Sequence, residues 1–229
     1  MNDGARLYDC PKAPHGYITI SDLDLYGSNP AAAADSVIVA PNAVGIDLFN
    51  QHIVYINNVR VSDFVTGIHG RQSYSVYITG SNISDNRGDN IRVDYDANSW
   101  RIRDSIISQA GGWGINVYGP GDATPLGKIN SSNDLLLDGL RLERNQRGAV
   151  RFIAYGSRLI NSRLEGNGKL SFSYPYRAIL VDKHATETRI LTNYFSGNCV
   201  QDHGIGTIRD FNIPSSYNTA ECRQLPITR

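Results

Sequence analysis

A repeat of about 22 to 24 residues is the feature that most constrains how this chain can fold. Seven apolar residues mark successive units, and they are separated by 36, 22, 24, 35, 22 and 31 residues. The longer separations fit the same unit with a loop inserted, and another apolar residue stands five positions after each marker. These markers, which we call anchors, are Ile20, Ile56, Ile78, Ile102, Leu137, Leu159 and Ile190. Repeats of this length predict a solenoid in which each unit stacks on the one before it.

Each anchor is followed by a residue type suited to a sharp corner. Six of the seven residues that lie two positions after an anchor are Asn, Asp or Gly, and the exception is Thr192. Asn, Asp and Gly adopt a left-handed backbone at low cost. We therefore expect a corner between two short strands and not a hairpin reversal. Four residues that lie eight positions after an anchor are Asn, which predicts a ladder of hydrogen-bonded amides between units: Asn86, Asn145, Asn167 and Asn198.

A third apolar stretch follows about twelve residues after most anchors. The stretches are Gly67–His69, Asn90–Val93, Gly114–Val117 and Ala149–Phe152, with Val44–Asp47 and Ala178–Val181 in the units that carry insertions. Three short strands cannot bury their apolar faces alone, whereas stacked units build a continuous core. The L-x-x-L-x-L pattern of leucine-rich repeats is absent, and a β-sandwich would need hairpin turns. The sequence therefore predicts an all-β parallel β-helix of about seven or eight coils, with three short strands per coil.

The repeat resembles that of the pectate-lyase-like right-handed parallel β-helix superfamily. The segments that carry the resemblance read INNVRVSDFVTGIHG, ITGSNISDNRGDNIRV and IRDSIISQAGGWGINV, and it extends over roughly residues 16 to 212. It implies a right-handed solenoid at 17–212, although no amphipathic N-terminal helix is visible to cap the first coil. The flanking segments lack the repeat, and we expect 1–16 to form an N-terminal cap or extension and 213–229 to form a tail that covers the last coil. The superfamily contains polysaccharide lyases, hydrolases, epimerases, esterases and phage tailspikes. The resemblance is therefore specific for the fold and not for the function.

Charge and hydropathy bear on the partners and the location of the chain. The 22 basic and 22 acidic residues lack the basic excess of a nucleic-acid-binding protein, and no apolar run reaches the roughly 18 residues that span a membrane. No signal-peptide pattern is visible, which alone does not fix the compartment. A bridge between Cys199 and Cys222 and free thiols are both open. From the resemblance, we expect an extracellular, cell-surface or virion location.

Alternation along the third strands predicts one polar surface. Residues next to the inward-pointing Ile68, Ile91 and Ile115 should point outward and stack about 4.8 Å apart from coil to coil. By resemblance, this sheet carries the substrate cleft. We interpret four outward residues as catalytic candidates and three as substrate-binding candidates. The catalytic candidates are His69, Arg92, Asp94 and Tyr118, and the substrate-binding candidates are Arg71, Asn116 and Arg151.

This set of residues suits a lyase or C5-epimerase that acts on an extended, acidic polysaccharide. Both reactions begin with removal of a proton next to a carboxylate. His69 or Tyr118 could act as the base, and Arg or Asn side chains could stabilise the enolate-like charge that develops. The alternative to a catalytic site is a solvent-exposed face without function, on which Arg92 and Asp94 form an ordinary surface ion pair that contributes under about 1 kcal/mol to stability.

Two other functions stay open. A glycoside hydrolase needs two carboxylates about 5 to 9.5 Å apart, and no Asp or Glu pair falls cleanly on adjacent coils. A non-catalytic carbohydrate-binding or tailspike/adhesin module fits the small number of coils, and it could form a homotrimer through outward apolar residues such as Ile153 and Leu180. None of these functions requires a cofactor, although a calcium ion could be held by oxygen ligands from Asp89, Asp94 and Asp96.

Loops and aromatic residues supply further candidate sugar contacts. The segment 118–133 is rich in Gly, Pro and Ser and follows a third strand, so we expect it to form one lip of the cleft. Tyr174 and Tyr176 lie in an insertion at 168–177 and could stack on sugar rings, or equally pack on the solenoid. We expect Trp113 to edge the cleft, whereas Trp100 begins a strand and could equally be structural.

Overall fold

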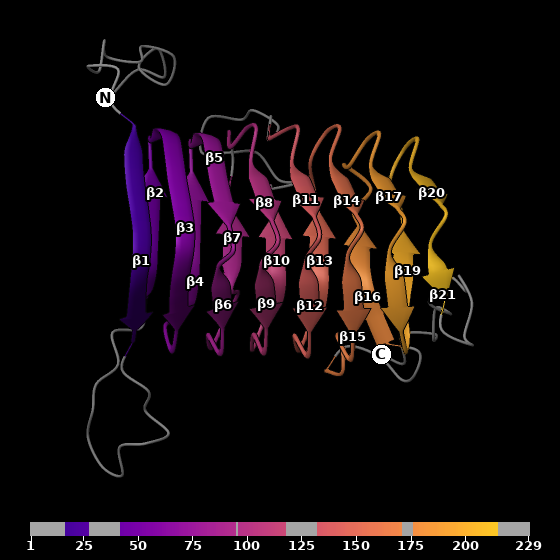
Figure 1. Cartoon of the computed structure of the whole chain (residues 1–229). Helices are drawn as coiled ribbons and strands as arrows, with labels where there is room; N and C mark the ends of the chain where they lie inside the picture. Colours follow the sequence, from indigo (N-terminus) through magenta and orange to yellow (C-terminus); the bar gives the residue numbers. More distant parts are fainter. Residues whose placement is uncertain (1–16, 28–41, 95, 118–131, 171–175, 215–229) are drawn as a thin grey trace.

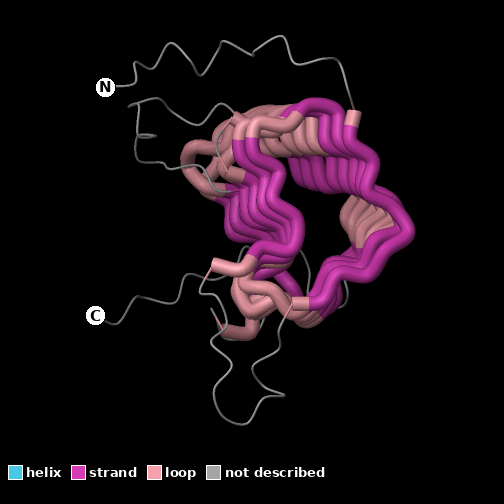
Figure 2. The backbone as a smooth tube through the Cα atoms, turned by 90° about the vertical axis from the view of Figure 1, so that its left-hand side faces the viewer, coloured by secondary structure: helices cyan, strands magenta, loops and turns pink. Residues whose placement is uncertain are grey.

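The chain forms a single stack of parallel β-strands. The computed structural model describes residues 17–27, 42–94, 96–117, 132–170 and 176–214. They contain strands and turns but no helix (Figure 1). Viewed along the stack, successive coils superimpose around a common interior (Figure 2). This is the parallel β-helix that the repeat predicts.

Each coil contributes three strands, and corresponding strands pair along the stack. The first strands are the leading halves of β1 (Ile18–Tyr26) and β3 (His52–Ser62), then β5 (Tyr74–Thr79), β8 (Arg101–Arg103), β11 (Leu136–Asp138), β14 (Arg158–Ile160), β17 (Arg189–Leu191) and β20 (Ile208–Asp210). The second strands are the trailing halves of β1 and β3, then β6 (Asn82–Ser84), β9 (Ile106–Ser108), β12 (Arg141–Glu143), β15 (Arg163–Glu165), β18 (Tyr194–Ser196) and β21 (Ile213–Pro214).

The third strands form a separate seven-stranded sheet. They are β2 (Val44–Phe49), β4 (Thr66–Arg71), β7 (Ile91–Val93), β10 (Trp113–Val117), β13 (Gly148–Phe152), β16 (Tyr176–Val181) and β19 (Asn198–Asp202). All strand pairs are parallel, and the described residues thus form seven complete coils and two strands of an eighth. We number the coils from β1.

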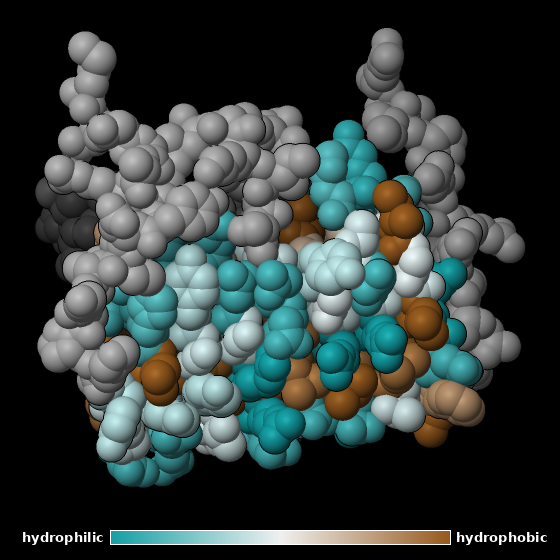
Figure 3. All heavy atoms as spheres, turned by 90° about the horizontal axis from the view of Figure 1, so that it is seen from above, coloured by the Kyte–Doolittle hydropathy of each residue, from teal (hydrophilic) through white to brown (hydrophobic). Residues whose placement is uncertain are grey.

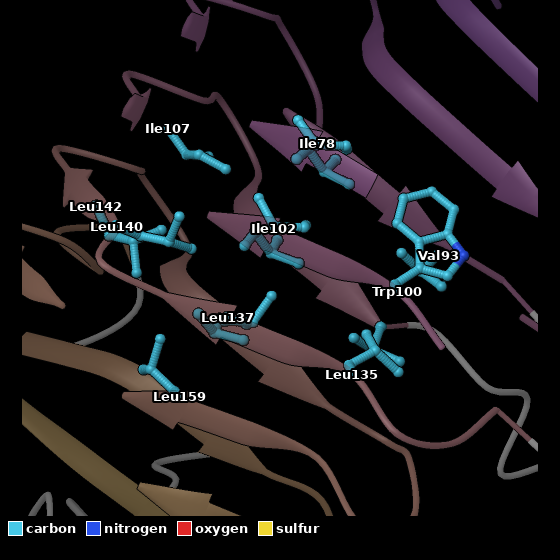
Figure 4. Packing of buried hydrophobic residues seen from close by; sticks show 14 of the residues in the cluster. Ile78, Val93, Trp100, Ile102, Ile107, Leu135, Leu137, Leu140, Leu142 and Leu159 are labelled. Carbon is cyan, nitrogen blue, oxygen red and sulfur yellow. The ribbon is translucent and has the colours of Figure 1, made fainter. Parts of the chain in front are cut away.

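The anchors pair with one another as the repeat predicts. Ile56 is opposite Ile78, Ile78 is opposite Ile102, and Ile102 is opposite Leu137 despite the insertion between them. Their side chains point into the solenoid, where Ile78, Ile102, Leu137 and Leu159 form one row (Figure 4). Each fully buried aliphatic side chain of this kind contributes roughly 1.5 to 3 kcal/mol. The row is therefore a main source of cohesion between coils.

Trp100 belongs to this interior. Its side chain is fully buried, and its indole N–H donates to the carbonyl oxygen of Ser73 at 3.3 Å. The ring lies so close to Gly70 that a Cβ there would come within 2.1 Å of it. The structural interpretation of Trp100 is therefore correct.

All three corners of the coil use left-handed residues. The predicted column, two residues after each anchor, has positive φ throughout, including 47° at Asp104 and 56° at Thr192. A second column begins the first strands, with Ile53 at 55° and Ser75 at 54°. The third column follows the second strands and includes Arg144 at 55°. One regular kink per corner keeps each coil in the same shape as the last.

The asparagine ladder runs along the third corner inside the coil. Asn145 is fully buried, its Nδ2 donates to Asn167 Oδ1 at 2.9 Å, and its Oδ1 accepts from the backbone N–H of Ala110 at 3.1 Å. Asn167 donates onward to Asn198 at 3.2 Å. Asn90 joins the ladder where coil 4 has Ala110 in place of an Asn, because its amide donates to Asn145 at 3.2 Å. The ladder satisfies polar groups that burial would otherwise leave unpaired.

The last described coil carries several exposed apolar side chains. They are Ile205, Ile208, Phe211 and Ile213. Seen from above, hydrophilic and hydrophobic residues are mixed, and hydrophobic ones are more frequent on the right, toward the C-terminal coils (Figure 3). Cys199 takes part in a disulfide, and its partner lies outside the described residues. The predicted cap at 1–16 and most of the predicted tail at 213–229 also lie outside the described residues. Among the described residues, no helix could cross a membrane.

Candidate functional site

The outer face of the third-strand sheet brings the predicted polar residues into register. Asp47 is opposite His69, His69 is opposite Arg92, and Arg92 is opposite Asn116. Asn116 is in turn opposite Arg151. Five successive coils thus place polar or charged side chains in a single column, spaced at about 4.8 Å by the sheet.

A carboxylate organises the centre of this column. Asp94 Oδ2 lies 2.8 Å from His69 Nε2, and Asp94 Oδ1 accepts from Arg92 Nε at 2.8 Å. Burial alone would raise the pKa of Asp94, but the hydrogen bonds from His69 and Arg92 outweigh it and lower the pKa below the usual 3.8. An ionised carboxylate only accepts hydrogen bonds. His69 Nε2 must therefore carry a hydrogen, which leaves Nδ1 unprotonated when the ring is neutral.

Asp47 and Arg71 flank the other side of His69. Asp47 Oδ2 accepts from Arg71 Nη2 at 2.7 Å, and its Oδ1 lies 4.0 Å from His69 Nδ1. A distance of 4.0 Å is too long for a hydrogen bond. The Nδ1 of His69 is therefore turned toward a carboxylate that already has a cation of its own.

Asn116 occupies the middle of the face with one acceptor unused. Its Nδ2 donates to Asp89 Oδ2 at 2.7 Å, and Asp89 Oδ1 accepts the backbone N–H of Trp113 at the same distance. Its own Oδ1 is buried and has no hydrogen-bond partner among the described residues. A buried acceptor without a partner is costly, so the two hydrogen bonds to Asp89 are what hold this part of the face in place.

Arg177 closes the site on the side of the C-terminal coils. Its guanidinium carbon lies 5.2 Å from the centre of the Trp113 ring, and its Nη1 donates to Gln201 at 2.9 Å. Burial, followed by repulsion from Arg151, lowers the pKa of Arg177 to about 10. Arg151 itself pairs with Asp182 at 3.5 Å.

Three expectations for this face need correction. The Trp113 side chain does not edge a cleft, because it is 4% exposed beneath Arg177 and against Gly148. Asp94 is 6% exposed with both oxygens engaged, so it positions His69 and Arg92 and is not itself placed to react. Ile153 is 4% exposed, so of the two apolar residues expected to point outward only Leu180, which is opposite Arg151 and partly exposed, lies on the outer face.

Of the three tyrosine candidates, the structure describes only Tyr176. Tyr176 begins β16 and is half-buried. Tyr118 and Tyr174 lie outside the described residues, as does nearly all of the expected lip at 118–133. Asp47 and Arg177, which complete the face, were not among the candidate site residues, although the register of Val44–Asp47 contained the signal for Asp47.

The described carboxylates do not gather into a metal site. No group of three or more His, Cys, Asp or Glu side chains among these residues could hold a metal ion. Asp89 accepts from Trp113 and Asn116, whereas Asp94 accepts from His69 and Arg92. Two of the three carboxylates proposed for calcium, Asp89 and Asp94, therefore serve different partners.

The parallel winding of the strands and the continuous third-strand sheet define a parallel β-helix protein with a column of polar side chains on one face. A family model described as "Right handed beta helix region" matches residues 13–221, so the chain belongs to the right-handed β-helix family. No curated protein sequence matches the chain.

Solved structures extend the comparison at low sequence identity. The alginate lyase from Paenibacillus sp. str. FPU-7 is 14% identical, the similarity covers 84% of this chain and 78% of the lyase, and the TM-score is 0.55. The Agl-KA catalytic domain is 12% identical over 73% of this chain, with a TM-score of 0.51, and the match covers 38% of that domain. At these identities the similarity concerns the fold alone.

Proposed function

We propose that this chain binds an extended, acidic polysaccharide along the third-strand face and acts on it as a lyase or C5-epimerase, with His69 as the general base. The observation that carries the proposal is the hydrogen bond between His69 Nε2 and the buried Asp94 carboxylate. In the neutral ring, this bond leaves Nδ1, which lies 4.0 Å from Asp47 Oδ1, as the unprotonated nitrogen that can accept a proton. The match in fold to an alginate lyase is consistent with this substrate class.

The proposed chemistry uses the column as a set of fixed partners for one uronate residue. His69 Nδ1 takes the proton next to the sugar carboxylate, and the guanidinium of Arg92 and neighbouring donors stabilise the negative charge that develops. In elimination, the electron pair forms a carbon–carbon double bond, the bond to the leaving oxygen breaks, and protonated His69 or Tyr118 returns a proton to that oxygen. In epimerisation, no bond to oxygen breaks and the proton returns to the opposite face.

Hydrolysis is less well supported by the same geometry. A glycosidase needs one carboxylic acid with a raised pKa to protonate the leaving oxygen. Asp94 has the opposite shift, because His69 and Arg92 favour its ionised form over the effect of burial. The remaining alternative is a non-catalytic binding module, which the ion pairs along the face favour because they neutralise several of its charges. An enzyme or module of this kind would work outside the cell or on a virion, and as a homotrimer in the tailspike case.

A panel of alginate, pectate and glycosaminoglycans tests the proposal. The ultraviolet absorbance of the unsaturated uronate product and the number of reducing ends are measured in the same samples. We expect both signals to rise for one polymer, and His69→Ala to lower the rate by about 10²- to 10⁴-fold, as expected for loss of a general base. Proton exchange from solvent into the polymer without new ends would identify an epimerase.

The matched control is Arg103→Ala, a substitution on an exposed first strand remote from the third-strand sheet. It should retain full activity. Reducing ends without absorbance would establish a hydrolase, and unchanged activity in His69→Ala would eliminate His69 as the base. No rise in absorbance or in reducing ends for any polymer, together with measurable binding, would establish a binding module.

A further inference from the structure

A second surface, separate from the third-strand face, is a groove lined by several cations. A groove of about 810 Å³ follows the corner between the second and third strands. It is lined by residues from coil 1 to coil 6, so it runs along the stack and not around one coil. Five of its lining residues come from successive coils: Arg60, Arg87, Gln109, Arg144 and Lys169.

The groove concentrates positive charge on a chain whose net charge is zero. Its lining includes four cations, Arg60, Arg87, Arg144 and Lys169, against the two carboxylates of Asp63 and Asp85. All four cations are exposed. None of them forms a salt bridge with any carboxylate in the described part of the chain.

The contrast with the third-strand face is informative. There, Arg71, Arg92 and Arg151 each have an aspartate partner at 2.7 to 3.5 Å. A ligand on that face must compete with an internal carboxylate, whereas a ligand in the groove meets cations that have none. Uncompensated cations along a concave surface attract anionic ligands strongly because the wall focuses their field.

We propose that the groove is a second binding site, which takes a stretch of acidic polysaccharide through its carboxylate or sulfate groups. Cations on coils 2, 3, 5 and 6, spaced by the roughly 4.8 Å coil repeat, suit a polymer that carries its charges at regular intervals. Gln109 supplies an amide for sugar hydroxyls on coil 4. The anionic character of the ligand follows from the groove alone, whereas the choice of a polysaccharide rests on the proposed function.

Single-stranded nucleic acid fits the groove less well. Such ligands are held largely by bases that stack on aromatic side chains. Tyr26 is the only aromatic residue in the described lining, and the guanidinium carbon of Arg60 already lies 5.4 Å over its ring. Binding of single-stranded nucleic acid is therefore the competing outcome that the experiment below can detect.

The experiment compares two charge-matched double variants of the full chain. The groove variant is Arg87→Glu with Arg144→Glu, and the control is Arg103→Glu with Arg189→Glu, two exposed arginines on first strands outside the groove. Binding of long alginate, polygalacturonate and heparin chains is measured by calorimetry at several salt concentrations, with circular dichroism to verify folding. We expect the groove variant to lose about tenfold or more in affinity and to show a shallower salt dependence, and the control to stay within about twofold.

Equal losses in both double variants, or no binding of any of the three polymers to the unmodified chain at low salt, would overturn the proposal. Tighter groove-dependent binding of single-stranded DNA than of the polysaccharides would replace the proposed ligand. His69→Ala separates the two proposals, because it should lower the rate of turnover by about 10²- to 10⁴-fold and leave groove binding intact. If His69→Ala retains turnover while the groove variant loses binding, the proposed function fails and the groove site stands.

Discussion

At the scale of single residues, the carboxylate of Asp94 fixes the geometry of two outward side chains. His69 and Arg92 come from neighbouring coils, and each is held by a different oxygen of Asp94 at 2.8 Å. Because Asp94 lies on the same strand region as Arg92 and one coil beyond His69, the pair is fixed across the gap between coils. The histidine tautomer and the direction of the arginine therefore depend on the same buried charge.

Asp94→Asn should destabilise the protein most at neutral pH. An amide offers one acceptor oxygen to two donors, so we expect a loss of about 1 to 3 kcal/mol in the free energy of unfolding. The folded-state pKa of Asp94 lies below the usual 3.8. Its stabilisation is therefore complete above the unfolded-state pKa and is lost as the pH falls through the lower folded-state value.

Urea unfolding of both proteins, from neutral pH down to about pH 2, measures this difference. The two free energies should converge in acid. Asp138→Asn serves as the control, because Asp138 lies 3.9 Å from its only described cation, Arg103, and an asparagine oxygen can still accept the hydrogen bond that Asn161 Nδ2 donates to Asp138 at 3.0 Å. A difference that stays constant over the whole range would show that the Asp94 charge is not the cause.

The sequence was sufficient to predict which residues form the polar column of the third-strand face, but not which of them are buried. Alternation along the third strands was sufficient to bring His69, Arg92 and Asn116 together, because pairing in register is a property of the backbone. Burial depends on neighbours that alternation does not reveal. Trp113 is covered because Gly148 leaves room for its ring and Arg177 reaches over it, and Arg177 stands beside a register shift in β16 that no periodic rule anticipates.

At the scale of elements, corners set the shape of the coil. The corner after the anchors was predictable because Asn, Asp and Gly dominate it. The other two corners were not, because they include Ile53, Gln109, Arg144 and Glu187, which have no preference for positive φ. At these places the pairing of flanking strands imposes the conformation on whatever residue stands there.

Ile53→Asn should therefore stabilise the chain. Ile53 is β-branched, holds φ at 55° and is 42% exposed, so its strain has little compensating burial. We expect a gain of about 1 kcal/mol in the free energy of unfolding, because Asn tolerates the left-handed region. Ile53→Val keeps the branch and should change stability very little. Chemical denaturation of the three proteins provides the measurement, and an equal response of Asn and Val would exclude strain at this corner.

At the scale of the whole molecule, stability depends on contacts between adjacent coils. Each interior coil packs against two neighbours, whereas the described coils at either end pack against one. With a neighbouring coil on one side only, all three residues of β20 are exposed, and those of β1 are exposed or half-buried. In such a stack the free energy of opening is close to a sum of nearest-neighbour interactions.

Hydrogen exchange followed by mass spectrometry should report a gradient along the stack. We expect the slowest exchange in β8, β10 and β13 and progressively faster exchange toward β1 and toward β20 and β21, because terminal coils open locally at lower cost. Variation of exchange within single coils that exceeds variation between coils would contradict this model. The same measurement with bound polymer would locate the protected face.

The even stacking of coils also has a geometric consequence for any bound polymer. The outer face is a one-dimensional lattice with a period of about 4.8 Å. A polymer whose own repeat is commensurate with that period can meet equivalent side chains on every coil, whereas any other polymer drifts out of phase after a few sugars. The number of sugars held at once is then limited by phase mismatch and not by the strength of a single contact, so the pitch of the protein itself acts as a filter on the ligand's repeat.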